Sequence, residues 1–270
     1  MPDMTKSLYN IRLLDELAER GTAIHHIHPL IKVLTTGVYV IVTVSFGKYE
    51  LAALLPLIFY PVILLTLADI PLVPVLQRAL LVSPLIIGIG IFNPLLDKAP
   101  MIILPWLQIS GGWISFLSLL TKGFFTILAA LILIATTGMT RIASALQMLR
   151  IPKLFIMQLL LTYRYISVLI EEVIRVMRAH SLRSFGGKGV KYKEWGPLIG
   201  QLLFRTLERA QHIYHSMCCR GFTGAYYVGK EQRIAAVDIL YVVGWSFYFV
   251  LVRSYDVPAL LGSLIMGVGR

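Results

Sequence analysis

The chain has 270 residues, of which 57% are hydrophobic and 14% charged, and its mean hydropathy is +0.76. This composition is too apolar for an ordinary soluble domain. The formal net charge of +11 is unevenly distributed, because residues 141–233 hold 15 of the 25 lysines and arginines against five acids and so account for +10. We therefore expect a membrane protein with one large basic segment.

Five apolar stretches predict membrane spans, each of which needs about 20 largely apolar residues. They are residues 30–46, 51–67, 72–92, 116–139 and 234–252. Two shorter stretches could raise the count to six or seven: residues 101–114, which could be re-entrant or interfacial, and residues 257–268. The charged leader before residue 30 is unlike the short basic start of a cleaved signal peptide.

The charge distribution predicts the topology, because lysine and arginine collect on the cytoplasmic side of membrane proteins. We expect an N-terminal membrane domain of about four spans (1–140), a cytoplasmic domain (141–233) and a C-terminal transmembrane segment (234–270). Lys48, Asp97 and Lys98 then lie in outward loops, and the N-terminus lies inside. The expected fold class is an all-α polytopic membrane protein with about five transmembrane helices and a cytoplasmic part built of long amphipathic helices.

Two amphipathic helices are predicted in the basic segment. In residues 154–180 the polar side chains fall on one stripe, where Glu171 can pair with Arg175 one turn later. In residues 198–217 an apolar seam of nearly heptad spacing faces the opposite way from the polar side chains. Its members are Ile199, Leu203, Leu207, Ala210, Tyr214 and Met217. At about 1.5 Å per residue, each helix would be roughly 30–40 Å long.

Both predicted helices end in an arginine, a small residue and a phenylalanine. The two copies are Arg183-Ser184-Phe185 and Arg220-Gly221-Phe222. A cation and a glycine are common at a helix C-terminus, so one copy needs no functional explanation. Packing of the two helices on each other explains their apolar faces. Two matched copies of the arginine motif favour a binding role.

At these motifs, and over most of its length, the chain resembles the transmembrane (T) component of energy-coupling factor transporters. The resemblance is to the CbiQ-like cobalt/nickel branch of that family. The similar segments are 24–32, 151–153, 161–165, 171–172, 207–210 and 220–224. The family's hallmark is a pair of short motifs with arginine between two small residues. Here Leu182 and Cys219 stand where the family usually has alanine. The resemblance implies that the ATPase-coupling residues are Leu182, Arg183, Ser184, Cys219, Arg220 and Gly221.

The resemblance also implies a function and a set of partners. Each arginine tip would dock into one of two cytoplasmic ABC-type ATPase subunits, which bind ATP and Mg. The chain would pass their closure to a substrate-binding integral membrane S component, CbiM/CbiN-like if the substrate is cobalt. It would lie as a multi-pass protein in a bacterial or archaeal cell (inner) membrane and hold no cofactor itself. Cobalt or nickel is the expected substrate, although vitamin importers share the same scaffold design.

An enzyme is the alternative class. The chain lacks a phosphate-binding loop, because Gly186-Gly187-Lys188-Gly189 has neither the upstream glycine nor the hydroxyl residue after lysine. A membrane enzyme that modifies lipid, with phosphate headgroups on the basic helices, needs an acid, base or metal that the sequence does not supply, and no catalytic residue is predicted. Membrane lipid is an expected contact of Lys188, Lys191 and Lys193, and nucleic acid is disfavoured because the basic residues alternate with apolar faces.

His25, His26 and His28 raise the question of a metal site, since imidazoles suit cobalt and nickel. Three histidines within four residues are more often surface or interface residues than a closed site. No aspartate or cysteine cluster lies nearby, and Pro29 restricts the backbone of His28. We therefore predict no metal ligands in this chain.

Overall fold

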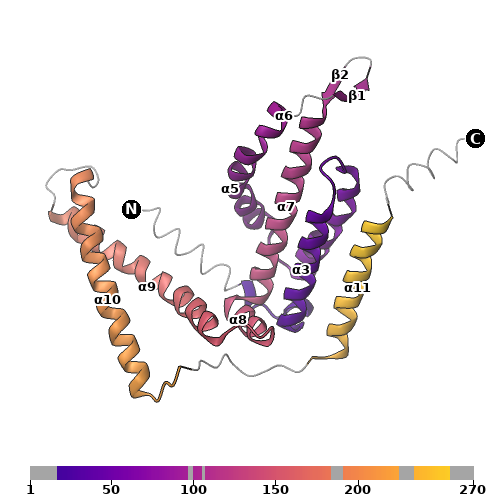
Figure 1. The fold of residues 1–270 in the computed structure, drawn as a ribbon. Coiled ribbons are helices and arrows are strands. Elements are labelled where there is room, and N and C mark those ends of the chain that lie inside the picture. The colour runs from indigo at the N-terminus through magenta and orange to yellow at the C-terminus, as the bar shows by residue number, and fades with distance from the viewer. Residues whose placement is uncertain (1–16, 97–99, 105–106, 184–190, 225–233, 256–270) are drawn as a thin grey trace, which may run out of the picture. The chain divides into compact units, whose positions relative to one another are not determined.

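The computed structural model describes residues 17–96, 100–104, 107–183, 191–224 and 234–255 (Figure 1). Contacts divide the chain into two units. The bundle unit comprises residues 15–138 and 231–270, and the rod unit comprises residues 1–14 and 139–230. Each is described by itself, within the described residues.

The bundle unit is helical apart from one β-hairpin. Its elements are α2 (Ala23–His26), α3 (Pro29–Ser45), the 3₁₀-helix η1 (Ala52–Ile58), α4 (Phe59–Leu67), α5 (Leu72–Gly90), α6 (Phe92–Leu96), β1 (Pro100–Leu104), β2 (Leu107–Ser110), α7 (Gly111–Thr137) and α11 (Ala236–Ser254). The five predicted spans all correspond to helices. Within the stretch 101–114, the described residues belong to the antiparallel pair β1–β2 and to the first residues of α7. The expectation of a re-entrant or interfacial position for this stretch stays a prediction. Residues 257–268 lie outside the described residues.

Four described helices are long and apolar enough to cross a membrane: Leu72–Pro94, Gly111–Thr137, Lys153–Arg183 and Ala236–Ser254. Pro29–Ser45 and Ala52–Leu67 are shorter apolar helices. Large apolar side chains face outward from the bundle, such as Leu81, which is 81% exposed. Such exposure suits a lipid environment, since soluble monomers rarely expose large contiguous apolar patches. The chain is thus an all-α polytopic membrane protein, as the sequence predicts.

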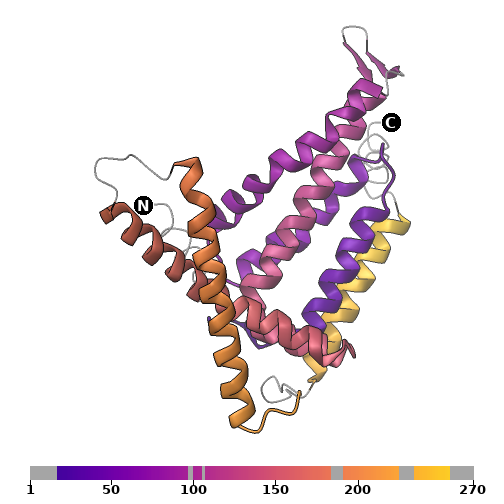
Figure 2. The same cartoon turned by 60° about the vertical axis from the view of Figure 1, so that its left-hand side comes forward.

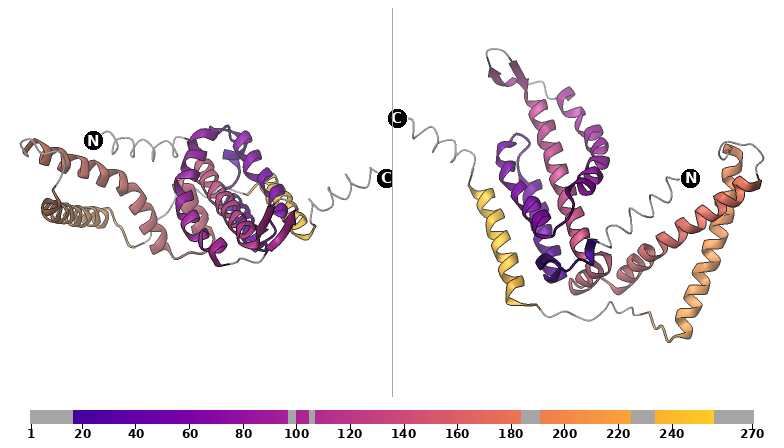
Figure 3. Two further views of the ribbon diagram at one scale, coloured as in Figure 1. Left: turned by 90° about the horizontal axis from the view of Figure 1, so that it is seen from above. Right: turned by 180° about the vertical axis from the view of Figure 1, so that it is seen from behind.

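Helix α7 is the central element of the bundle unit, where it contacts α3, α4, α5 and α6 (Figures 1 and 3). Two glycines bring α5 and α7 together. A Cβ on Gly90 would lie 2.8 Å from the ring of Phe116, and a Cβ on Gly123 would lie 2.7 Å from Ile86. Small residues allow this close approach of helices in membranes, where packing rather than the hydrophobic effect drives association.

Aromatic side chains join α3, α4 and α11. The rings of Tyr39 and Tyr60 stack with their centroids 4.6 Å apart, and Phe249 lies 5.2–5.3 Å from both. The Tyr39 hydroxyl donates to the carbonyl of Leu57 at 3.2 Å, and Tyr248 makes the same kind of bond to η1 at 2.7 Å. These bonds satisfy carbonyl groups in a 3₁₀ segment interrupted by a proline, which removes a backbone donor.

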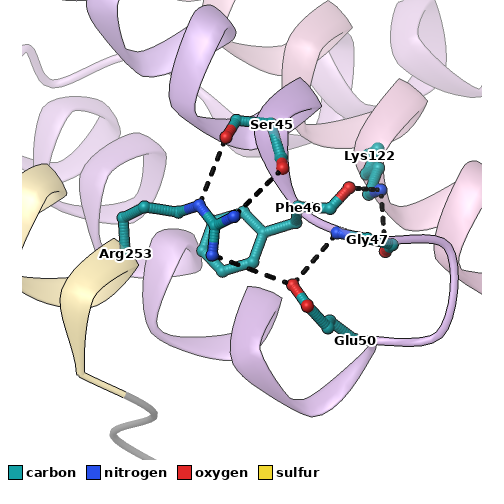
Figure 4. Close-up of polar contacts among 6 residues, drawn as sticks. All are labelled: Ser45, Phe46, Gly47, Glu50, Lys122 and Arg253. Carbon is teal, nitrogen blue, oxygen red and sulfur yellow. Dashed lines mark hydrogen bonds and ion pairs between the residues drawn. The ribbon is translucent and has the colours of Figure 1, made fainter.

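Two cations from other helices hold the turn that follows α3 (Figure 4). Lys122 of α7 donates to the carbonyls of Phe46 and Gly47 at 2.6 and 3.1 Å. Arg253 of α11 donates to the hydroxyl and the carbonyl of the serine that ends α3, at 3.2 and 3.4 Å. Glu50 accepts from the Gly47 amide at 3.0 Å and lies 4.0 Å from Arg253. The cations therefore supply donors to carbonyls beyond the helix end.

The rod unit consists of α8 (Met139–Met148), α9 (Lys153–Arg183), η2 (Tyr192–Glu194) and α10 (Trp195–Cys219). The two predicted amphipathic helices are α9 and α10, each a few residues longer than expected, whereas α8 was not predicted. Ala143 of α8 and Ile156 of α9 form a small buried core with three partly buried aliphatic neighbours. Arg150, in the left-handed region at φ +62°, makes the turn between α8 and α9.

Candidate docking surface on helices α9 and α10

The two long helices of the rod unit, α9 and α10, are drawn in Figure 2. A buried carboxylate joins them. The side chain of Glu172 in α9 is only 8% exposed, and Arg205 of α10 donates to its Oε1 at 2.7 Å. Arg175 and Arg209 lie 3.7 and 3.9 Å from its other oxygen. Arg175, the predicted partner of Glu171, lies beside Glu172, the residue that faces α10. The pairing of Glu171 with Arg175 stays a prediction.

The arginines determine the charge state of this carboxyl group. The hydrogen bond from Arg205 lowers the pKa of Glu172 below its ordinary value, while burial opposes the shift and the charges of Arg175 and Arg209 add to it. Glu172 is therefore ionised at neutral pH. The contact between α9 and α10 is then a charge-assisted hydrogen bond, which is stronger than a neutral one.

The second contact between these helices lies near their connecting loop. His180 Nε2 and Glu194 Oε2 are 3.1 Å apart, which brings the end of α9 beside the start of α10. Helix α10 has 25 residues and is about 37 Å long. Arg183, at the end of α9, and Arg220, just after α10, therefore lie near opposite ends of α10.

The side chains of both motifs are open to solvent. Leu182 is 79% exposed, and Arg183, Cys219 and Arg220 are also exposed. Ser184 lies outside the described residues. The structure thus brings Leu182 and Arg183 together at one end of the rod unit, and the Cys219–Gly221 motif at the other.

Gly221 has a structural reason to be glycine. Its φ is +81°, in the left-handed region that other residues adopt with strain. Its amide donates to the carbonyl of Cys218, and the Phe222 amide donates to that of Met217, both at 3.0 Å. This pair of bonds is a Schellman motif, which ends a helix. The small residue after Arg220 is therefore explained by helix termination.

The apolar seam of α10 is unburied. None of the 25 residues of α10, all of which are described, is buried. Its exposed large apolar side chains include Ile199, Leu203, Leu207 and Tyr214 of the predicted seam, together with Phe204, which is 71% exposed. An exposed apolar helix face of this kind marks an interaction surface.

His25 and His28 have structural roles, which corrects the expectation that these two histidines are surface or interface residues. His25 is buried: its Nε2 donates to the carbonyl of Leu17 at 3.0 Å, and its Nδ1 lies 2.7 Å from the hydroxyl of Thr22. His28 is also buried, and its ring accepts from the Leu30 amide as the N-cap of α3. His26 alone is exposed. Among the described residues, no group of three His, Cys, Asp or Glu side chains could hold a metal ion.

Two buried charged residues that the sequence reasoning missed fix the same region. Asp238 accepts from the His28 amide at 2.9 Å and from the Ala235 amide at 2.8 Å, which connects the start of α11 to the start of α3. Lys32 donates to the carbonyl of Thr136 at 2.9 Å, which connects α3 to the end of α7. Both residues are charged and lie within the first turn of an otherwise apolar helix, and this pattern in the sequence could have indicated that they bind neighbouring backbone groups.

Comparison with known proteins identifies the family. The family described as "Cobalt transport protein" (CbiQ) matches residues 20–231. An uncharacterized protein of Methanocaldococcus jannaschii is 27% identical over 67% of this chain and 65% of its own length. The energy-coupling factor transporter transmembrane protein EcfT of Leuconostoc gelidum is 25% identical over 86% of this chain and 93% of its own. Nickel permease LarQ of Lactiplantibacillus plantarum is 30% identical over 39% of this chain and 38% of its own length.

The alignments span less than two thirds of the length of the Methanocaldococcus protein and of the nickel permease. The family match, in contrast, covers well over half of this chain, including all of α3 to α10. The chain therefore belongs to the CbiQ family of cobalt transport proteins, the branch of energy-coupling factor transmembrane components that its sequence resembles.

Proposed function

We propose that this chain is the energy-coupling scaffold of an ATP-driven importer of the energy-coupling factor type, with cobalt or nickel as substrate. The family description names cobalt, and one relative is named a nickel permease. The name of the EcfT relative specifies no substrate, so a vitamin importer with the same scaffold is the alternative. In this proposal the chain itself hydrolyses nothing, and ATP and Mg are bound by partner ATPase subunits.

One observation carries the proposal: two exposed arginines lie near opposite ends of a helix about 37 Å long. They are too far apart to anchor one small partner surface, which favours two docking sites. The guanidinium group suits this role, since it is permanently charged and offers five donors to carboxylates and carbonyls in a partner groove. We assign one ATPase subunit to Arg183 with Leu182 and Ser184, and the other to Arg220 with Cys219 and Gly221.

The exposed apolar seam of α10 is the surface on which we place a further partner. Its exposed side chains, such as Leu203 and Leu207, would be buried by an apolar surface, and the S component is the partner that we assign to it. The contact between Glu172 and Arg205 ties α9 to α10. A displacement imposed at either arginine tip would then move both helices, and the seam between the tips would move with them.

We place the rod unit on the cytoplasmic side of a cell (inner) membrane. Helix α9 is long and apolar enough to span by length and composition alone. Its C-terminal half, however, carries Glu171, Glu172, Arg175 and Arg178, and charged residues are costly in a span. The +10 net charge of residues 141–233 favours the cytoplasmic side.

The test of this proposal is co-purification of ATPase subunits with variants of the full chain, alongside metal uptake by the same cells. Losing one partner of a buried, hydrogen-bonded charge pair costs about 2–5 kcal/mol. Arg183→Ala or Arg220→Ala should therefore weaken assembly, and the double variant should abolish assembly and uptake. Arg178→Ala, also an exposed arginine of α9, and Lys191→Ala are the matched controls. Normal assembly and uptake with the double variant would show that these arginines only cap helices.

A further inference from the structure

A basic cavity of about 750 Å³ lies between α9 and α10. Its charged lining residues are Arg164, Arg205, Arg209 and Arg220 on the positive side and Glu172 and Glu208 on the negative side. The arginines and glutamates of the lining give it a formal net charge of +2. Arg164 lies on α9 and Arg209 on α10, so both helices supply cationic side chains to the cavity wall.

An apolar cavity of about 310 Å³ adjoins the basic one and shares part of its wall. Leu161, Tyr165, Leu169 and Arg209 line both cavities. The apolar cavity is completed by aliphatic and aromatic side chains, among them Met157, Ala210, Tyr214 and Phe222. Cationic and apolar chemistry thus lie side by side along the same pair of helices.

We propose that the two cavities together bind one anionic phospholipid, with its phosphate on Arg164 and Arg209 and part of an acyl chain in the apolar cavity. Arginine suits this role because its planar fork of donors matches phosphate oxygens. A free phosphate would satisfy the basic cavity alone, whereas a lipid fills both, and this favours the membrane as the source. Basic segments are attracted to the anionic cytoplasmic leaflet. The inference does not depend on ATPase docking at Arg183 or Arg220.

The lipid is to be measured on the full chain in nanodiscs that contain phosphatidylglycerol and phosphatidylcholine in equal amounts. Native mass spectrometry after release from the nanodisc reports which lipid stays bound. We expect phosphatidylglycerol to be retained in preference to phosphatidylcholine. Arg164→Gln should lower this preference about fivefold, as expected for one cationic side chain near a lipid phosphate. Arg178→Gln, an exposed arginine of α9 outside both cavities, should leave it unchanged.

Two further variants separate the site from a general loss of structure. Glu208→Gln removes a negative charge from the basic cavity and should strengthen the preference for phosphatidylglycerol, which a damaged fold would not do. Ala210→Phe fills the apolar cavity and leaves the arginines in place, so it should weaken lipid retention. Glycerol phosphate, which has the phosphate but no acyl chain, should bind much more weakly than the lipid.

The proposal is overturned if both lipids are retained equally, or if Arg164→Gln and Arg178→Gln lose phosphatidylglycerol to the same extent. Equally tight binding of glycerol phosphate and of the lipid would also overturn it, because the acyl chain would then add nothing to binding and the site would bind a soluble phosphate. An Ala210→Phe chain with unchanged retention would remove the acyl-chain part of the assignment.

Discussion

Arg205 of α10 and Glu172 of α9 form a hydrogen-bonded ion pair, with 2.7 Å between Nη1 and Oε1. The carboxylate is buried, whereas about half of the arginine side chain is exposed. The pair lies midway along the two helices, away from the arginine motifs at either end. Together with the contact between His180 and Glu194, it joins α9 to α10.

Removing the carboxylate charge should loosen the rod unit. We expect Glu172→Gln to destabilise the α9–α10 contact by about 1–2 kcal/mol, with the value limited by solvent screening of the half-exposed arginines. Thermal unfolding of the purified chain measures the effect. A double-mutant cycle with Arg205→Gln should give a coupling energy of about 1 kcal/mol. Strictly additive effects of the two changes would mean that the pair does not hold the helices together.

The same contact predicts a pH dependence. Because the pKa of Glu172 is lowered in the folded chain, its ionised form contributes stability that is fully present above the ordinary glutamate pKa of about 4.3. That contribution is lost as the pH falls through the lowered folded pKa. The stability difference between the wild-type chain and Glu172→Gln should thus be constant from pH 5 to 7 and shrink below about pH 4. A difference that stayed constant down to pH 3 would contradict this assignment.

Gly221 provides a test of the helix stop after α10. Gly221→Ala would place a Cβ at φ +81° and should cost about 1 kcal/mol. Gly200→Ala is the matched control, because Gly200 lies inside α10 with open space at its Cβ position, so alanine there should favour the helix. Hydrogen exchange of the amides of residues 217–222 reports the difference. Equal protection in both variants would indicate that the glycine is not needed to end the helix.

The topology can be tested by cysteine labelling from each side of the membrane. Cys218 and Cys219 are exposed, so both must first be changed to serine. In that background, Lys191→Cys should react with an impermeant maleimide only from the cytoplasmic side, and Lys48→Cys only from the outside. Both positions are exposed, which makes them comparable. Reaction of both from the same side would refute the proposed topology.

The substrate proposal predicts cobalt or nickel uptake by cells that express the chain with its partner subunits. Uptake of radioactive cobalt should exceed that of cells that lack this chain, and unlabelled nickel should compete with it. Vitamin uptake in the same cells is the comparison. Transport of a vitamin without any metal uptake would contradict the metal proposal and favour the alternative, a vitamin importer.

Hydropathy and helical periodicity were sufficient to predict the longer helices of the bundle, such as α3, α5, α7 and α11, and the two long helices of the rod unit. Pro29 marks the start of α3, and the polar stripes locate α9 and α10. The β1–β2 pair and α8 were missed, because short apolar or mixed stretches suit several local structures. The contact of Glu172 with α10 was also not predicted, since adjacent residues on a helix differ by about 100° and only the partner helix decides which one is buried.

Long-range contacts explain the remaining differences. The amide of His28 donates to Asp238, which is 210 residues away in the sequence, and the local spacing of residues cannot predict such a contact. His25 is buried because Leu17 and Thr22 supply partners for both ring nitrogens. The docking roles proposed for Arg183 and Arg220 rest on the sequence motif, since the end of a helix in one chain does not reveal its partner.

The turn held by Lys122 and Arg253 has a consequence for the thickness of the membrane around the bundle. Helix α3 has 17 residues and is about 26 Å long, whereas α7 has 27 residues and is about 40 Å long. A hydrocarbon layer is about 30 Å thick, so if α3 crosses such a layer the carbonyls after it would lie close to acyl chains, where unpaired groups are costly. The two cations remove that cost and permit hydrophobic mismatch between neighbouring helices. A short helix beside a long one is accommodated either by tilt of the bundle or by local thinning of the bilayer beside α3. The acyl-chain length of the host lipids then determines how large the tilt or the thinning has to be.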